Sequence, residues 1–525
     1  MTRPNILVVM TDQQKADTLA IYGNTHTQTP AIDSIASSGV VVGGHICNYP
    51  ACTPARATFH TGRYSHTTRV RANHLHLPER EITLPAVLKS AGYEIALVGK
   101  NHVFSDGSLG SQFRDGGLAL MDWPRQIDEF EQFTKDLSQT IPLANQKRMF
   151  DHWFQADHFG PQGPKFNDLR QFSLRPELWR SHAATAVTPF PPGHTTSAVL
   201  GTEAAKFISA RKGAEKPWFL WLSFPDPHSP YHVPEPFYSM YDPADVMIPP
   251  HDSLESKPER QRIGSRMCGV RGYDERLIRE ATRTQYAMVS AIDAALSEAI
   301  DALEISGQRE NTIVLYTTDH GAYVGDHGAW HKGLAFYDCL TRLPLMISWP
   351  GTLRPGTSHS GFFEQVDVMP TLLSLAGINI PPGVQGRSMA EPLQGNAPLR
   401  EMAFSEAGEP GEPVGWDQLP FIPDSPLDDR YFGWDGFQEA WVGRAKMVRN
   451  QRWKYVWYAN CDEELYDLQD DPDELSNIAG ATEHDELKRE LKDALLEWTV
   501  ETEDTLPLHS RNIYLEDLVT GNFPF

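Results

Sequence analysis

The chain has 525 residues, of which 40% are hydrophobic and 22% charged, a composition typical of a soluble globular protein with room for a sizeable core. Its 46 Lys and Arg against 69 Asp and Glu give a net charge of -23, so the overall field repels nucleic acid and anionic membranes. We therefore expect no nucleic-acid or membrane partner, and any bound anion requires a local cluster of positive groups.

The first residues, MTRPNILVVMTDQQ, contain a single short apolar run that polar residues follow at once. Such a run is too short for a signal peptide or a membrane span, and we expect a cytoplasmic protein. The five cysteines are scattered and form no CxxC pair. This pattern indicates neither a disulfide framework nor a thiolate zinc site.

Four apolar runs, rich in Val, Ile, Leu and aromatic residues, predict strands buried on both faces. Each run ends in polar side chains. In chain order these are Asp12 and Gln13 after NILVVMT, Lys100 and His102 after EIALVG, His228 after PWFLWLSFPDP, and Asp319 and His320 after NTIVLYTT.

Helical patterns alternate with these strands and end at Gly92, Gly213 and near Gly307. The alternation predicts an α/β fold, with a large and mostly parallel sheet flanked by helices. Ligands of such sheets bind at the carboxyl ends of the strands, so we expect the polar residues to converge there.

Two stretches, at about 105–195 and 234–273, lack clear periodicity and predict long loop excursions within a first domain of residues 1–400. Their aromatic residues are candidates for pocket walls or for simple packing: Trp123, Phe154, Trp179 and Tyr231. Residues 401–525 predict a smaller α+β C-terminal subdomain, because the strand-like EAWVGRAKMVRNQRWKYVWYA precedes the helical DELKRELKDALLEWTVE.

The stretch CTPARATFHTG predicts a short helix with Thr53 as N-cap, Pro54 as first residue and an end at Gly62. Cys52 then lies just ahead of a helix N-terminus, where an oxyanion is favoured. Arg56 in the first turn opposes the helix dipole, so we expect its guanidinium to face an anion or a carboxylate. A buried cysteine and a surface arginine are the alternative.

Asp12 with Gln13, and Asp319 with His320, form two pairs of potential metal ligands. If the two strand ends are neighbours, these pairs predict a divalent-cation site with positions open to substrate. Helix caps or turns explain each pair when it is taken alone. The oxygen ligands suit Ca²⁺, Mg²⁺ or Mn²⁺, and the imidazole favours Mn²⁺.

These residues resemble the formylglycine-dependent sulfatase family of the alkaline phosphatase superfamily. The resemblance runs in order through PNILVVMTDQQ, CTPARATFHTGRYSH, ITLPAVLKSAGYEIALVGKNH, FPDPHSPYHVP, TIVLYTTDHGAYVGDHGAWHKG, TRLPLMISWPG, EQVDVMPTLLSLAGI and ELYDLQDDPDELSNIAG. It covers nearly the whole chain and makes residues 1–400 a sulfatase-like catalytic domain. The implied reaction converts a small aryl or alkyl sulfate into sulfate and an alcohol, and the implied assembly is a homo-oligomer.

The resemblance also implies that a maturation enzyme oxidises Cys52 to formylglycine (3-oxoalanine), with Pro54 and Arg56 in its recognition motif. A thiol or hydroxyl that accepted a sulfuryl group would be left as a stable ester. An aldehyde hydrate instead has a second hydroxyl that can expel the group as the carbonyl reforms. A divalent metal, Ca²⁺ or Mn²⁺, would polarise the first hydroxyl.

Roles carry over from the family position by position. The implied metal ligands are Asp12, Gln13, Cys52 after conversion, Asp319 and His320. The implied cations on the formylglycine and the sulfate are Arg56, Lys100 and Lys332. His102 matches the group that takes a proton from the hydrate, and His228 matches the group that protonates the departing alcohol.

Other polar residues carry weaker predictions. Asn73 and His327 fall at family-like positions and fit equally well as support of the site or as plain structure. For the remaining histidines of this region we expect exposed or turn positions: His60, His66, His74 and His76.

The branch of the family is predicted by two departures from its commonest pattern. Many sulfatases have Asp in place of Gln13 and Asn in place of His320, and the pair found here is similar to choline sulfatases and phosphonate monoester hydrolases. In the phosphonate hydrolases the lysine and histidine of GKNH are replaced, so Lys100 and His102 favour sulfate esters.

Three other functions are weighed against a sulfatase. A phosphonate monoester or phosphodiester hydrolase has a substrate of the same tetrahedral, singly charged form. A catalytically silent binding protein predicts gaps among the charged residues, and the sequence shows none. A cysteine-nucleophile hydrolase leaves the two metal-ligand pairs unexplained.

Overall fold

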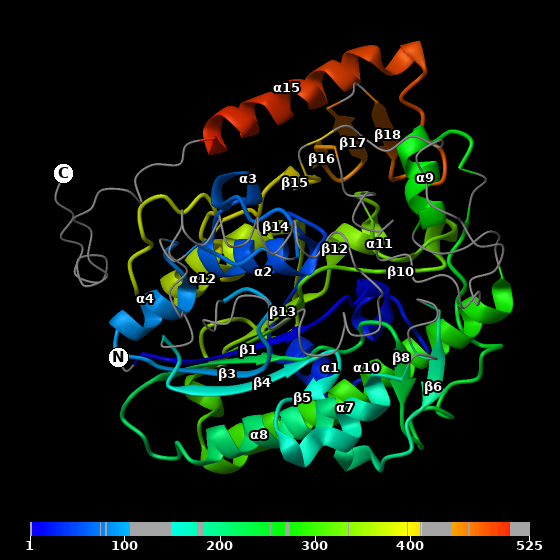
Figure 1. Cartoon of the computed structure of the whole chain (residues 1–525). Helices are drawn as coiled ribbons and strands as arrows, with labels where there is room; N and C mark the ends of the chain where they lie inside the picture. The colour runs from blue at the N-terminus through cyan, green and yellow to red at the C-terminus, as the bar shows by residue number, and fades with distance from the viewer. Residues whose placement is uncertain are drawn as a thin grey trace, which may run out of the picture.

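The computed structural model of the chain describes residues 3–73, 75–78, 81–104, 149–175, 178, 183–251, 254–267, 274–333, 335–395, 397–409, 411, 443–459 and 462–503 (Figure 1). A ten-stranded sheet lies at its centre, in the order β12-β2-β13-β9-β1-β7-β3-β4-β5 with β14 paired to β2. Its strands are β1 Asn5–Thr11, β2 Val40–Ile46, β3 Glu94–Lys100, β4 His152–Asp157, β5 Gly160–Pro161, β7 Trp218–Ser223, β9 Thr312–Thr318, β12 Arg342–Leu343, β13 Leu345–Ser348 and β14 Thr357–Glu364.

The four predicted strands are neighbours at the centre of this sheet. β9, β1, β7 and β3 run parallel, with Val8 of β1 level with Leu315 of β9 and Trp221 of β7. Their side chains are almost entirely buried, as expected for strands covered on both faces. The predicted α/β fold with a mostly parallel sheet is confirmed.

Helices cover both faces of the sheet (Figure 1). Alternate residues of β1 point to opposite sides, so Val8 packs with one layer and Leu7 with the other. The layer with Val8 contains α2 Cys52–Thr61, α4 Leu84–Ser90 and α12 Val368–Leu375. The layer with Leu7 contains α1 Pro30–Ser37, α8 Thr196–Ser209 and α10 Glu275–Ser306.

The predicted loop excursions are partly wrong. Within 105–195 lie β4, which pairs in parallel with β3, and also β5, α7 Asn167–Ser173 and β6 Thr185–Val187; β6 pairs with β8 Tyr231–Val233. Within 234–273 lies α9 Glu259–Met267. β4 is half-buried and lies near the edge of the sheet. Polar residues interrupt its apolar residues, so its sequence shows neither the continuous apolar run nor the strict alternation that predicts a strand. Residues 105–148 lie outside the described part of the chain.

The C-terminal part is a smaller α+β unit. Its antiparallel sheet consists of β15 Ala403–Ala407, β16 Ala445–Arg449, β17 Trp453–Tyr458 and β18 Glu463–Asp467. α15 Asp485–Thr502 packs on this sheet through Leu491, Leu495 and Trp498 (Figure 1). Short segments complete the described fold: α3 Ser65–Thr68, β10 Tyr323–Val324, β11 Trp330–His331, α11 Asp338–Thr341 and α13 Ala390–Leu393. Among the described helices, none is long and apolar enough to span a membrane.

Candidate functional site

The polar residues predicted to converge do meet at one edge of the sheet. They follow the carboxyl ends of β1, β3, β7 and β9, and α2 and the β10–β11 hairpin bring further residues to the same place. The residues assembled there are Asp12, Gln13, Cys52, Arg56, Lys100, His102, His228, Asp319, His320 and Lys332.

The start of α2 differs from the prediction. The helix begins at Cys52, and its cap residue is Ala51, which makes no side-chain cap hydrogen bond. Thr53 instead lies in the first turn, where its backbone N–H donates to Asn73 Oδ1 at 3.1 Å and its hydroxyl to the Asn73 carbonyl at 3.0 Å. Asn73 therefore anchors the helix start, and Cys52 Sγ is carried by the first helical residue.

Arg56 faces two carboxylates, as its position in the helix predicted. Its side chain is fully buried, with Nε 2.8 Å from Asp319 Oδ2 and Nη2 3.5 Å from Asp12 Oδ2. Nη1 also donates to Ser223 Oγ at 2.8 Å. A guanidinium fixed by these bonds holds the two acids at a set spacing on neighbouring strands.

Four side chains meet as a possible metal site. Single donor atoms of Asp12, Cys52, Asp319 and His320 lie within 4.8 Å of one another, and all four residues are buried. His320 Nδ1 donates to the Gly321 carbonyl at 2.7 Å, so the lone pair of Nε2 is directed at the site. Nε2 is 3.9 Å from Asp12 Oδ1 and 3.8 Å from Asp319 Oδ1.

Gln13 supports the same fit. It adopts the left-handed backbone conformation, with φ of 62°, which costs energy for a residue other than glycine. Its buried Nε2 has no hydrogen-bond partner among the described residues. Oε1 accepts a hydrogen bond from Lys332 Nζ at 3.1 Å. Two carboxylates, an amide oxygen and an imidazole form a donor set that fits a divalent cation such as Ca²⁺ or Mn²⁺.

Cys52 lies between these acidic ligands and the lysines. Its Sγ is 3.2 Å from His320 Nε2 and 3.2 Å from Lys332 Nζ. Burial and Asp12 favour the neutral thiol, but Lys100 and its cationic neighbours outweigh them and lower the pKa of Cys52 to about 6. The site thus favours a negative charge at this side chain.

Asp12 is held as a carboxylate by several cations. Burial opposes its ionisation, yet Lys100 above all, together with Arg56, keeps the pKa of Asp12 well below its ordinary value. Lys100 Nζ contacts Asp12 Oδ2 directly.

The two predicted proton carriers are buried beside these groups. His228 Nδ1 contacts the Ser229 carbonyl, and Nε2 lies 3.4 Å from Lys332 Nζ. Burial, together with nearby cations, keeps the pKa values of His228 and His102 well below the ordinary histidine value. His102 has a positive φ of 56°, and its Nδ1 is buried without a partner in the described structure.

Two further histidines that the sequence analysis did not select adjoin the site. His158 Nε2 is 2.9 Å from Lys100 Nζ, and its ring centroid is 4.0 Å from that of His228. The His331 ring lies 4.8 Å from the His228 ring, at 88° to it. His331 precedes Lys332 in the chain. The position of His158 directly after the short run HWFQAD was the one available signal.

Several expectations for other residues are corrected. His60 is fully buried against Phe59, Phe104 and Trp221 rather than exposed, and His66 is half-buried. Residues distant in sequence cover both side chains, since Trp221 packs against His60 and Trp498 against His66.

The remaining candidates have structural surroundings. His76 is half-buried, and the His327 ring stacks on Tyr337 at 3.8 Å. Tyr231 is buried in a core cluster, and Phe154 packs against Phe166. Of the two roles predicted for these aromatic residues, pocket wall or packing, both residues therefore have packing. Trp123, Trp179 and His74 lie outside the described residues.

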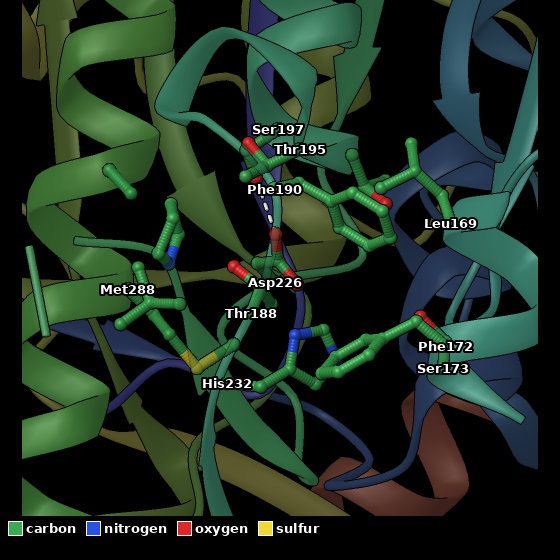
Figure 2. A pocket seen from close by; sticks show the side chains of 14 residues that line it. Leu169, Phe172, Ser173, Thr188, Phe190, Thr195, Ser197, Asp226, His232 and Met288 are labelled. Carbon is green, nitrogen blue, oxygen red and sulfur yellow. Dashed lines mark hydrogen bonds between the residues drawn. The ribbon is translucent and has the colours of Figure 1, made fainter. Parts of the chain in front are cut away.

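A cavity of about 30 Å³ lies beside the segment that carries His228; Asp226, which faces Ser197, and Phe172 are among the residues that line it (Figure 2). Ser197 Oγ donates to the Asp226 carboxylate, and burial raises the pKa of that group to about 6. The Asp226 carbonyl accepts the Asp12 N–H at 3.1 Å. A cavity of this volume has room for one or two waters.

The fold and these buried charges define an α/β enzyme whose site suits an anionic ester. Known proteins agree with this class. The Sulfatase family matches residues 4–378, and "N-sulphoglucosamine sulphohydrolase, C-terminal" matches residues 426–501. The chain belongs to the sulfatase family, within the alkaline phosphatase superfamily, and is a sulfuric ester hydrolase by class.

Its relatives include the multifunctional alkaline phosphatase superfamily protein PehA of Trinickia caryophylli, 27% identical over 98% of both chains. An arylsulfatase of Clostridium perfringens is 27% identical over 92% of both chains. A choline-sulfatase of Rhizobium meliloti is 27% identical over 91% of this chain and 82% of its own.

Among solved structures, the phosphonate monoester hydrolase of Silicibacter pomeroyi shares the fold, with a TM-score of 0.74, 22% identity and coverage of 96% and 97% of the two chains. The predicted membership of the sulfatase family is confirmed, with a choline-sulfatase among the relatives and phosphonate monoester hydrolases among the solved structures that share the fold. The family implies a metal ion and formylglycine.

Proposed function

We propose that this chain hydrolyses small sulfate monoesters and that Cys52, converted to formylglycine by a maturation enzyme, carries the nucleophile. One observation carries the proposal. The Cys52 side chain lies 3.2 Å from a metal-ligand candidate, His320, and 3.2 Å from a cation, Lys332. A nucleophile at this point would have the acidic ligands on one side and the sulfate-binding lysines on the other.

The metal ion and the formylglycine would supply the remaining chemistry. A divalent ion, Ca²⁺ or Mn²⁺ with the imidazole favouring Mn²⁺, would act as a Lewis acid, and the aldehyde hydrate would offer one hydroxyl for attack and one for release. The residues that would hold the ion are Asp12, Gln13, Asp319, His320 and the converted Cys52.

The chain's own residues then do four things. Lys100 and Lys332 bind the sulfate oxygens and stabilise charge that grows in the transition state. Arg56 holds the carboxylates of Asp12 and Asp319 in place. His102 takes a proton from the nucleophile. His228 turns Nε2 toward the departing alcohol, because Nδ1 contacts the Ser229 carbonyl. Since the pKa of His228 is well below its ordinary value, Nε2 must first take up a proton before it can pass one to the alcohol.

The net charge of -23 supports a small substrate. A polysulfated chain would meet repulsion over the whole surface, whereas a monosulfate needs only the local cluster. The homo-oligomer and the cytoplasmic location stay predictions.

A phosphonate monoester or phosphodiester hydrolase is the second candidate. Two observations favour it: the Gln13 and His320 pair, and a relative whose name calls it multifunctional. Both substrate classes place one negative charge on a tetrahedral centre, so one site can accept either.

A four-substrate panel tests the proposal. The matured, metal-loaded enzyme is assayed on an aryl sulfate, choline sulfate, a phosphate diester and a phosphonate monoester. We expect the highest kcat/KM on one of the two sulfates. A phosphonate or diester rate above both sulfates would favour the second candidate, and no turnover of any ester would contradict both. Chelation should remove activity, and added Mn²⁺ or Ca²⁺ should restore it.

A further inference from the structure

His158 stands at the tip of a short hairpin aimed at the site. β4 and β5 pair with Asp157 opposite Gly160, so His158 and Phe159 form the turn between them. Asp157 Oδ1 accepts the Phe159 N–H at 2.8 Å and Arg170 Nη1 at 3.1 Å. Since β4 runs parallel to β3, with Ala156 level with Lys100, the hairpin tip reaches the edge where the catalytic candidates meet.

The His158 side chain touches two residues that the proposed reaction uses. Its Nε2 is 2.9 Å from Lys100 Nζ, and its ring lies 4.0 Å from the His228 ring at an angle of 33°. Nε2 also lies 4.0 Å from Asp12 Oδ2. The side chain is only 21% exposed, so these contacts account for much of its surroundings.

The contact with Lys100 fixes the form of the imidazole. A lysine ammonium has donors and no acceptor, so His158 Nε2 must accept this hydrogen bond, and the ring proton then sits on Nδ1. Lys100 Nζ already contacts the Asp12 carboxylate, and a neutral acceptor orients the ammonium without adding a second negative charge beside it. His158 therefore holds Lys100 without further reducing its attraction for an anion.

The contact with His228 fixes a second ring. His158 lies against one side of His228, and His331 meets it edge-on at 4.8 Å. Held between two rings, His228 has little freedom to rotate. Its Nε2 stays turned toward Lys332 Nζ, at 3.4 Å.

We propose that His158 is a positioning residue of this site, which holds Lys100 through its Nε2 and His228 through its ring. The inference rests on the proposed function. The two contacts can be separated by substitution: His158→Gln keeps an acceptor oxygen and loses the ring, and His158→Phe keeps a ring and loses the acceptor.

The test compares these two variants and His158→Ala with the wild type, all matured and metal-loaded. His194→Ala is the matched control, because His194 is 38% exposed and pairs with Asp168. Two quantities are measured: the affinity for inorganic sulfate by calorimetry, and kcat and KM on the best sulfate ester.

We expect His158→Phe to weaken sulfate binding and to raise KM, each about tenfold, with kcat changed less. A change of about tenfold corresponds to the loss of one hydrogen bond to a charged group. His158→Gln should bind sulfate within about twofold of the wild type, while kcat falls about tenfold because the His228 ring loses its support. His158→Ala should show both defects, and His194→Ala neither.

Three results would overturn the inference: unchanged sulfate affinity in His158→Phe, identical losses in all three His158 variants, or a wild type that binds no sulfate. The proposed function can fail separately. If the wild type cleaves no sulfate ester, yet sulfate affinity drops in His158→Phe and not in His158→Gln, the hold on Lys100 stands and the assignment of the reaction falls.

Discussion

Two buried ionic clusters of this molecule are built on opposite plans. Where the C-terminal sheet meets the main domain, Lys454 Nζ is 2.6 Å from both Asp338 Oδ1 and Glu474 Oε1, and Arg449 also pairs with Asp338. Two cations there face two acids. In the candidate active site, three cations face two carboxylates among the described residues: Arg56, Lys100 and Lys332 against Asp12 and Asp319.

The difference separates a stabilising cluster from a binding one. Partners already present satisfy the balanced cluster, so it holds two parts of the fold together. In the catalytic cluster the third cation faces Cys52 rather than a third acid, with Lys332 Nζ 3.2 Å from Sγ, and Gln13 Nε2 has no hydrogen-bond partner among the described residues, so this cluster is arranged around a reactive side chain. Mutations in the first should therefore change stability, and mutations in the second should change turnover.

The largest expected effect is that of Cys52→Ala. We expect kcat to fall by at least ~10³-fold, because the nucleophile is removed, while the melting temperature stays close to that of the wild type. Alanine favours a helix, and no capping bond is lost, since Ala51 caps α2 without its side chain. Cys339→Ala is the control and should retain activity. Turnover by Cys52→Ala would contradict the assignment.

Lys332→Ala should lower kcat by roughly 10²-fold, because a cation at the growing negative charge is lost. Steady-state kinetics on the best ester measure this. Lys206→Ala, at an exposed lysine paired with Glu203 on α8, serves as the control. An unchanged kcat would remove Lys332 from the site.

Substituting the two buried lysines by methionine sharpens the comparison. Lys454→Met should cost about 3–5 kcal/mol of unfolding free energy, because Asp338 and Glu474 lose a buried partner, and kcat of the folded enzyme should not change. Lys332→Met should cost far less stability and most of the activity. Denaturant unfolding measures both, and equal losses of stability would show that the two clusters do not differ.

Low pH should weaken a contact outside the two clusters, between Glu406 of β15 and His66 of α3. Glu406 Oε1 accepts the His66 N–H at 2.7 Å. Burial would raise the pKa of Glu406, but His66 and Lys446 outweigh it and lower this pKa to about 2. Because the folded pKa lies below the unfolded one, the stabilisation is present above pH ~4.5 and is lost as pH falls toward 2.

Glu406→Gln therefore should cost roughly 3 kcal/mol of unfolding free energy at pH 7. The difference in unfolding free energy between Glu406→Gln and the wild type should become smaller as the pH falls from ~4.5 to 2. Urea unfolding at pH 7, 4 and 3 measures this difference, and a difference independent of pH would refute the linkage.

The smallest expected effect concerns salt. Raising the ionic strength screens the repulsion between a net charge of -23 and a disulfated substrate, so its kcat/KM should rise about twofold relative to that of a monosulfate. A ratio that falls with salt would indicate a basic surface that attracts polyanions.

Much of this site could be predicted because its residues follow strands with a strong apolar pattern. Asp12 and Asp319 directly follow β1 and β9, and the parallel pairing of these strands brings the two residues together without any further tertiary information. Arg56 was predictable for a related reason, since a cation in the first turn of a helix needs an acidic partner.

Other features depend on packing that local sequence does not encode. β4 is a half-buried strand near the sheet edge whose apolar residues are interrupted by polar ones, so the short run HWFQAD was only a weak signal for the strand that carries His158. His60 of helix α2 is buried because Trp221 of strand β7, distant in sequence, lies beside it, at 4.3 Å between ring centroids. The cap of α2 was mispredicted because Asn73, distant in sequence, binds Thr53.

One measurement tests the central claim most directly: the mass of the peptide that contains Cys52, in protein made with and without a formylglycine-generating enzyme. The site would also suit a thiolate, since the pKa of Cys52 is lowered to about 6, so the two chemistries must be told apart. We predict that the aldehyde appears only with the maturation enzyme and that specific activity rises in proportion to the converted fraction. Full activity in protein whose Cys52 is entirely free thiol would contradict the account.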